Sequence, residues 1–255
     1  MTEPLLEARG VVKNYGQVAA LRGVDFTVYP GEVVALIGDN GAGKSTLTKI
    51  LSGAAQPDEG ELLFEGRQVE LTAPQVAHEL GIETVYQDLA LAPDLDPASN
   101  MYLGRELMLP GILGKLGFLD RKAMRSKTDE TFRGLHVKLQ TTDGAVANLS
   151  GGQRQGVAVS RAVNWANKVI FMDEPTAALG VVQSENVLNL IRTVRRRGVA
   201  VVLISHSMPQ VKEVADRVEV LRLGQRVHVF DDVANTSMED FVGAMTGALH
   251  VKEVQ

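Results

Sequence analysis

The feature that most constrains this chain is a glycine-rich stretch, GDNGAGKST, at residues 38–46. It matches G-x-x-x-x-G-K-[ST], the pattern of a phosphate-binding loop, at every required position. An apolar run at residues 33–37 precedes it, and Leu47, Ile50 and Leu51 follow it at helical spacing. The sequence therefore predicts a strand, a loop and a helix, which is the context that this pattern requires. A glycine-rich turn that binds nothing is the less favoured alternative.

The residue types in this stretch supply the groups that a triphosphate needs. Glycines let the backbone curl until several amide N–H groups point at one place, and a helix start adds the positive end of its dipole. Lys44 would reach the β- and γ-phosphates, and the hydroxyl of Ser45 would ligate Mg²⁺. We predict that the chain binds a nucleoside triphosphate through Gly38, Asp39, Asn40, Gly41, Ala42, Gly43, Lys44, Ser45 and Thr46.

Length, charge and composition limit which kinds of partner and which cellular settings are expected for this chain. A chain of 255 residues can bury one domain, or a core with a subdomain. Its formal net charge of −5 argues against nucleic acid, whose phosphates would repel it. No apolar run approaches the roughly 20 residues of a membrane-spanning helix, and the first residues do not predict a secretory signal. Without cysteine, neither a disulfide framework nor a thiolate metal site is expected. We expect contact with a membrane only at its surface or through a partner.

The pattern of apolar residues predicts an α/β core interrupted by a helical insertion. Between about residues 89 and 149, prolines and glycines separate stretches of helix-forming composition, and no convincing strand is visible. A capping box from Thr236 to Glu239 is expected to open the last helix, which would run to about Met245. Strands are expected at 5–12, 24–28, 33–37, 61–64, 68–71, 82–86, 169–172, 199–204, 218–223 and 226–230, and helices at 120–135 and 182–197.

Two adjacent carboxylates follow the apolar run at residues 169–172. Asp173 and Glu174 would lie at the carboxyl end of a buried parallel strand, the sheet edge at which α/β proteins bind ligands. Asp173 would bind Mg²⁺ directly or through water, and Glu174 would orient and deprotonate an attacking water. A solvated turn is an equal alternative for the pair alone. A complete phosphate loop in the same chain favours the catalytic interpretation.

A second motif, LSGGQ at residues 149–153, sits about 20 residues before that pair. Ser150 and Gln153 have the spacing of a capping box, and a helix start with two glycines and a hydroxyl is also an anion site. Beside the phosphate loop and the apolar strand ending in Asp-Glu, this motif resembles the signature of ATP-binding-cassette (ABC) ATPases. The resemblance covers nearly the whole chain. It implies an α/β fold in which a P-loop NTPase (RecA-like) core with an antiparallel β-subdomain, residues 1–88 and 150–255, carries a helical subdomain at 89–149.

Other positions match the family one at a time. The resemblance implies that Tyr15 stacks on adenine, that Gln87 links the γ-phosphate and Mg²⁺ to a membrane partner, and that His206 contacts the γ-phosphate. Taken alone, each of these residues would have an ordinary structural role. The implied catalytic residues are Glu174, His206 and Gln87; the implied Mg²⁺ ligands are Ser45, Gln87 and Asp173; and the implied contacts to the ATP of a second copy are Ser150, Gly151, Gly152 and Gln153.

One position departs from the family pattern. After Pro175 and Thr176 the family usually continues to Leu-Asp, whereas this chain has Ala177, Ala178 and Leu179 followed by Gly180. The missing carboxylate commonly couples the two nucleotide sites of a dimer. The departure puts that coupling in question, and leaves ATP binding and the step assigned to Glu174 untouched.

The sequences around these motifs look most similar to ATPases of ribose- and fructose-type sugar importers. The resemblance implies a head-to-tail homodimer that holds two ATP molecules, transmembrane permease subunits, and indirectly a periplasmic sugar-binding protein. The chain would then work as a peripheral protein on the cytoplasmic face of the bacterial inner membrane, with no nucleic-acid partner. Three alternatives stay open: an importer of another solute such as an amino acid, a non-transport cassette ATPase, and a clamp that binds ATP without hydrolysing it.

Overall fold

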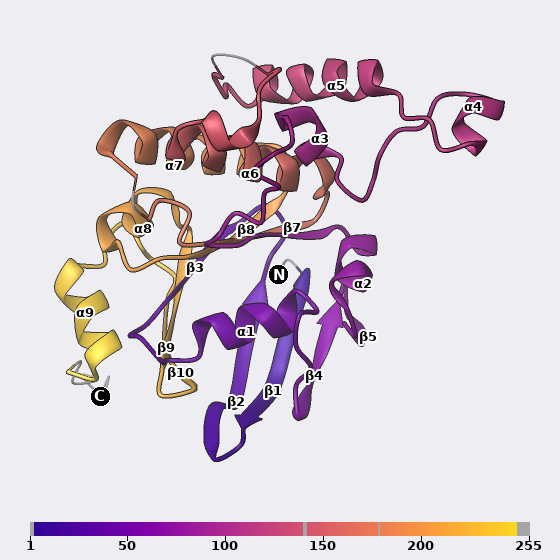
Figure 1. Cartoon of the computed structure of the whole chain (residues 1–255). Helices are drawn as coiled ribbons and strands as arrows, with labels where there is room; N and C mark the ends of the chain where they lie inside the picture. The colour runs from indigo at the N-terminus through magenta and orange to yellow at the C-terminus, as the bar shows by residue number, and fades with distance from the viewer. Residues whose placement is uncertain (1–2, 140–141, 178, 249–255) are drawn as a thin grey trace.

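Two sheets form the frame of the protein (Figure 1). In the computed structural model, which describes residues 3–139, 142–177 and 179–248, the larger sheet has the strand order β10-β9-β3-β8-β7-β6. Its pairs are parallel except for the β9–β10 hairpin at one edge. These strands are β3 (Val33–Ile37), β6 (Ile82–Val85), β7 (Val169–Asp173), β8 (Ala200–Ile204), β9 (Arg217–Arg222) and β10 (Gln225–Phe230).

The smaller sheet is antiparallel, with the order β2-β1-β4-β5. Its strands are β1 (Leu6–Tyr15), β2 (Val18–Val28), β4 (Glu59–Phe64) and β5 (Arg67–Val69). Helix α1 (Lys44–Leu51) lies between the two sheets in Figure 1, and its Leu47, Ile50 and Leu51 are buried in the core that they share. The expected antiparallel β-structure is therefore present, and the helix after the phosphate loop is held by both sheets.

Helices cover the opposite face of the larger sheet. Buried residues of α6 and α7 pack on β7 and β8, and those of α8 and α9 pack on β3 and β9. These elements are α6 (Gly151–Trp165), α7 (Val181–Arg196), α8 (Met208–Val214) and α9 (Met238–Thr246). Helix α2 (Pro74–Glu79) instead packs through Ala77 in the core that contains α1. Within the described ranges, no helix is long and apolar enough to cross a membrane.

The chain between β6 and β7 is helical, as its composition predicts. It contains α3 (Pro97–Met101), α4 (Ile112–Lys115), α5 (Arg121–Gly134) and a 3-10 turn, η1 (Val146–Asn148). Helix α5 corresponds to the helix expected at 120–135. The only strand pairing found among its described residues is an isolated bridge between Met108 and Leu119. Residues 140–141 of this region lie outside the described part of the chain.

The start of the last helix differs from the prediction by one residue. Ser237, rather than Thr236, is the N-cap: Asp240 N–H donates to Ser237 Oγ at 3.1 Å, and Ser237 N–H donates to Asp240 Oδ2 at 3.2 Å. The Thr236 hydroxyl donates instead to the carbonyl of Asp232 at 2.7 Å. Both spacings fit a capping box, and the preceding turn uses the threonine, which shifts the helix start.

A buried ion network joins the larger sheet to the turn that leads into the phosphate loop. Arg217 of β9 pairs with Glu32 at 2.9 Å and with Glu219, and it donates to the carbonyl of Thr27 on β2. Glu219 is fully buried and also faces Arg226 at 3.4 Å. Removing one partner of such a network leaves a charge in a poorly solvated place. The network therefore fixes β9 against the segment that positions β3.

We expect Glu219→Ala to lower the free energy of unfolding by roughly 3 kcal/mol, because Arg226 loses its partner and Arg217 keeps only Glu32. Glu213→Ala is the matched control, since Glu213 pairs with Arg192 at the surface. That change should cost less than about 1 kcal/mol. Urea denaturation followed by circular dichroism measures both values, and equal losses would contradict a structural role for the buried network.

Candidate functional site

The predicted phosphate loop lies between β3 and α1. Strand β3 is buried along its whole length, and α1 begins directly after Gly43. Gly38 and Gly43 have φ angles of 151° and 107°, in the range that favours glycine. A Cβ on Gly38 would lie 2.1 Å from the carbonyl oxygen of Leu221, and one on Gly43 would lie 2.7 Å from that of Ala20. The loop therefore packs backbone against backbone, which only glycine allows.

A pocket of about 370 Å³ opens at this loop and brings most of the predicted residues together. The carboxyl ends of β7 and β8 supply Asp173, Glu174 and His206, and the segment after β6 supplies Gln87. The loop itself lines the pocket with Asn40, Gly41, Ala42, Gly43, Lys44, Ser45 and Thr46. Gly38 and Asp39 do not line the pocket directly, and their carbonyls accept hydrogen bonds from Lys44 Nζ at 2.7 and 3.1 Å.

Burial shifts the pKa values of the lysine and of the two acids in this pocket in opposite directions. The side chain of Lys44 is only 8% exposed, and desolvation lowers its pKa, while Glu174 and Asp173 act to raise it. Burial raises the pKa of Asp173 and of Glu174. The Lys44 charge opposes that rise at Asp173, and the charge of His206 opposes it at Glu174. One ammonium thus faces two carboxyl groups in a half-buried space.

The backbone of Glu174 is strained, and its carboxyl group is incompletely hydrogen-bonded. Its backbone φ is 49°, which is uncommon for a residue with a side chain, and Glu174 N–H donates to the carbonyl of Ile204 at 2.9 Å. Its Oε1 is buried and accepts no hydrogen bond from the described residues. His206 Nδ1 lies 3.0 Å from this oxygen, near enough to pair by charge when protonated but without hydrogen-bond alignment. A buried carboxylate oxygen that accepts no hydrogen bond fits a group that accepts a proton from a reactant.

The segment that carries Gln87 is clamped by a residue that the sequence did not single out. Leu89 and Ala90, just after Gln87, have φ angles of 62° and 45°. The guanidinium of Arg161, on α6, donates to their carbonyls at 3.0 and 2.7 Å. This clamp holds the strained turn. The signal in the sequence was only one arginine on the expected helix, which identifies no partner.

The predicted adenine contact lies beside the pocket rather than in its wall. Tyr15 is about half exposed and pairs with Val18 across the β1–β2 turn, and Val18 lines the pocket together with Ala19 and Ala20. Lys13 Nζ lies 5.8 Å from the centre of the Tyr15 ring. Nothing in the residue types of Val18, Ala19 and Ala20 predicted that they line the pocket.

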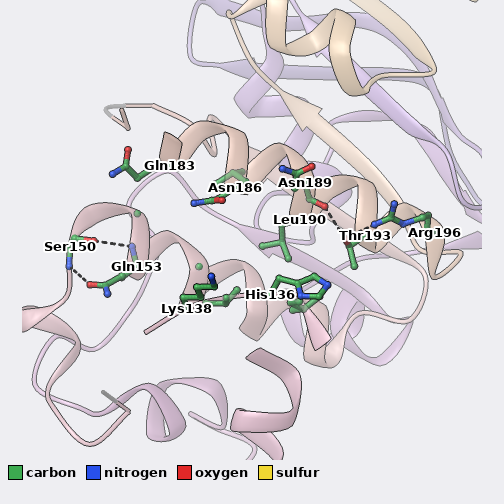
Figure 2. Close-up of a pocket in the computed structure, with 15 residues that line it drawn as sticks. His136, Lys138, Ser150, Gln153, Gln183, Asn186, Asn189, Leu190, Thr193 and Arg196 are labelled. Carbon is green, nitrogen blue, oxygen red and sulfur yellow. Dashed lines mark hydrogen bonds between the residues drawn. The ribbon is translucent and has the colours of Figure 1, made fainter. Parts of the chain in front are cut away.

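The LSGGQ motif lies on a different surface. Ser150 caps α6 by accepting from Gln153 N–H at 3.3 Å, and Gln153 Oε1 accepts from Ser150 N–H at 2.9 Å, as predicted (Figure 2). Ser150, Gly152 and Gln153 line a groove of about 800 Å³ that runs along α7 to Arg196; Gly151 is the first residue of α6. This groove is larger than the pocket at the phosphate loop but holds none of the paired carboxylates, so we place the chemistry in the smaller one.

The donors in the smaller pocket fit a magnesium–triphosphate pair. A hydroxyl from Ser45, a carboxylate from Asp173 and an amide oxygen from Gln87 are the hard oxygen ligands that Mg²⁺ takes. Among the described residues no group of three or more His, Cys, Asp or Glu side chains could hold a metal alone. Mg²⁺ commonly binds through one or two protein ligands together with substrate phosphates and water, so this sparse set fits it.

Comparison with known proteins agrees with this geometry. The family model described as "ABC transporter" matches residues 21–177. The chain is 55% identical to the fructose import ATP-binding protein FrcA of Rhizobium meliloti, over 96% of this chain and 95% of that protein. It is 43% identical to the ribose import ATP-binding protein RbsA 2 of Burkholderia pseudomallei, over 96% of this chain but 47% of that protein. The chain therefore spans about half the length of the ribose relative.

A solved ATP-binding cassette of an ABC transporter has a similar structure. It aligns with a TM-score of 0.81 and 26% identity, over 95% of this chain and 99% of that one. The predicted fold class, a P-loop NTPase core with antiparallel and parallel sheets, is confirmed.

The glycines of the loop give a direct test of its packing. We expect Gly38→Ala to weaken the binding of a fluorescent ATP analogue at least about tenfold, because the loop must shift away from Leu221. Gly41→Ala is the control: its φ is 78°, but a Cβ there would meet nothing within 4 Å. It carries only the left-handed backbone cost of roughly 1 kcal/mol, which is present with and without ATP, so the affinity should change less than about fivefold. Equal affinities of the two variants in a fluorescence titration would contradict this account.

Proposed function

The chain belongs to the ABC transporter family of ATP-binding cassettes, and from this premise we propose that it is the ATPase subunit of a monosaccharide importer. It binds ATP and is an ATPase. The observation that carries the proposal is the meeting of the phosphate loop, Asp173, Glu174 and His206 in one pocket, in a chain whose similar relatives are named as sugar import proteins.

We propose the following roles in the pocket. The loop amides and Lys44 hold the phosphates, Ser45 and Asp173 hold Mg²⁺ with help from Gln87, and Tyr15 stacks on adenine. When bound, Mg²⁺ neutralises phosphate charge. Glu174 takes a proton from the attacking water, and His206 contacts the γ-phosphate. The buried oxygen of Glu174 without a hydrogen bond supports its role as the base.

We propose that two copies associate head to tail around two ATP molecules. The supporting observation is the separation within one chain: Lys44 lines one pocket, while Ser150, Gly152 and Gln153 line another groove. The α6 start, with its capped serine and free dipole end, suits the γ-phosphate held by a second copy. ATP then joins the copies, and hydrolysis with phosphate release separates them.

The proposed role in transport implies two further partners, a permease and a sugar-binding protein. Transmembrane permease subunits bind the helical subdomain, residues 89–149, and the Gln87 segment, so that closing and opening of the dimer drive alternating access. A periplasmic binding protein delivers the sugar, and the chain lies on the cytoplasmic face of the inner membrane. The relatives named for fructose and ribose import support a monosaccharide as solute.

We expect Glu174→Gln to leave ATP binding intact and to trap an ATP-bound dimer. The amide keeps the shape of the side chain but cannot take a proton from water. Size-exclusion chromatography with light scattering, with ATP and without it, measures the dimer, and phosphate release measures hydrolysis. Glu213→Gln, at a surface ion pair far along the chain, is the matched control and should behave as the wild type. Normal turnover of Glu174→Gln would remove Glu174 from the role of base.

The solute is tested through the proteins that accompany the chain. We expect the tagged wild-type protein to co-purify with a permease and, through it, with a binding protein whose ligand is a monosaccharide. Calorimetric titration of that binding protein with fructose, ribose, xylose and a set of amino acids identifies the solute. Preference for an amino acid would contradict the sugar assignment but leave the ATPase assignment in place.

A further inference from the structure

An arm of residues 103–120 projects from the helical region, with α4 at its far end (Figure 1). Leu109 N–H donates to the carbonyl of Phe118 at 2.9 Å, and Asp120 N–H donates to that of Leu107 at 2.6 Å. These bonds and the bridge between Met108 and Leu119 close the arm into a hairpin. The arm is therefore a defined structure that holds its tip away from the body.

The base of the arm is tied to both elements that lead to the site. Arg105 pairs with the buried Glu83 of β6 at 2.8 Å, and its guanidinium lies 4.8 Å from the centre of the Trp165 ring on α6. Trp165 Nε1 in turn donates to the carbonyl of Met101 at 2.9 Å. These contacts anchor the arm to the strand that precedes Gln87 and to the helix that begins at the LSGGQ motif.

The tip of the arm exposes large apolar side chains. The exposed fractions are 77% for Ile112, 50% for Leu113, 68% for Leu116 and 54% for Phe118, and α4 has no buried residue. Apolar groups this close together are unfavourable in water, each by roughly 1.5–3 kcal/mol relative to burial. An exposed apolar cluster of this kind marks a surface that contacts something else.

The charge near this tip is positive, although the whole chain is negative. Residues 112–122, from the start of α4 to the start of α5, contain three Lys or Arg and one Asp, a net charge of +2, against −5 for the chain. Lys115 lies within the tip, and Arg121 and Lys122 follow at the start of α5. These three cations are exposed, and in the described part of the chain none pairs with a carboxylate.

We propose that the permease binds the helical subdomain outside the arm, and that the tip of the arm, Ile112, Leu113, Leu116 and Phe118, inserts into the headgroup region of an anionic lipid membrane. An apolar face bordered by cations is the pattern of interfacial membrane segments, in which apolar side chains enter the acyl boundary and cations meet lipid phosphates. A convex tip enters a fluid boundary readily, whereas a protein partner would have to offer a matching hollow. The proposal does not depend on the sugar assignment.

The test measures binding of the purified full chain to vesicles. Sedimentation of the protein with vesicles of phosphatidylcholine alone is compared with its sedimentation with vesicles that contain about one third phosphatidylglycerol. Both are measured at 0.1 M and at 1 M salt, because the electrostatic screening length falls from about 10 Å to about 3 Å between these concentrations. We expect binding to the anionic vesicles, weakened by high salt. The double variant Ile112→Asp, Leu116→Asp should lower the partition coefficient at least about tenfold.

The double variant Val227→Asp, Val242→Asp is the matched control, because these residues are 43% and 51% exposed on β10 and α9, remote from the arm in the sequence, and the variant adds the same two negative charges. It should bind vesicles as the wild type does. ATP hydrolysis and thermal unfolding of the arm variant in solution should match those of the wild type, which excludes misfolding.

Three results would overturn the proposal. The first is that the wild-type protein does not bind anionic vesicles. The second is that the arm variant binds them with the same partition coefficient as the wild type. The third is an arm variant that loses only its association with a co-purified permease or with a second copy, which would assign the tip to a protein partner. A failure of sugar binding in the partner proteins would affect none of these measurements.

Discussion

The structure depends on one electrostatic constraint: a buried ammonium must be balanced by two carboxyl groups that come from another strand. Lys44 is held by the loop after β3, while Asp173 and Glu174 end β7, two places away in the sheet order. Burial disfavours the charged form of all three groups, since it lowers the pKa of the lysine and raises that of the acids. The charge of Lys44 opposes the rise in pKa at both carboxyl groups, whereas the charge of Asp173 adds to it at Glu174. Parallel strands of matched register hold the three groups close together.

Much of this arrangement could be predicted, because its determinants are local. The glycines at 38 and 43, the apolar strands and the capping residues Ser150 and Gln153 each act within a few residues of sequence. The ends of parallel strands meet at one sheet edge, so motifs far apart in the chain could be assigned to one pocket. The helix start at 237 shows the limit of such reasoning: two neighbouring residues had capping spacing, and a hydrogen bond from Thr236 to the preceding turn decided between them.

What could not be predicted depends on contacts between distant segments. Val18 and Ala20 form part of the pocket wall because β2 curls past the loop, and their residue types indicate nothing of the kind. The clamp of Arg161 on the carbonyls of Leu89 and Ala90 joins groups 71 and 72 residues apart. Residue propensity and apolar periodicity describe one segment at a time. A side chain whose partner lies in a distant segment therefore cannot be recognised from the sequence pattern around it.

Several of these contacts between distant segments are made by the same helix, α6. Arg161 and Trp165 both lie on α6, the helix that begins with the LSGGQ motif, and they hold the turn after Gln87 and the base of the arm. Arg105 links the same arm to β6, which ends just before Gln87. The arm is therefore joined by direct side-chain contacts to the two segments that would face ATP. Because Ser150 begins α6 and Arg161 of the same helix holds the turn after Gln87, any rotation of α6 would displace both segments.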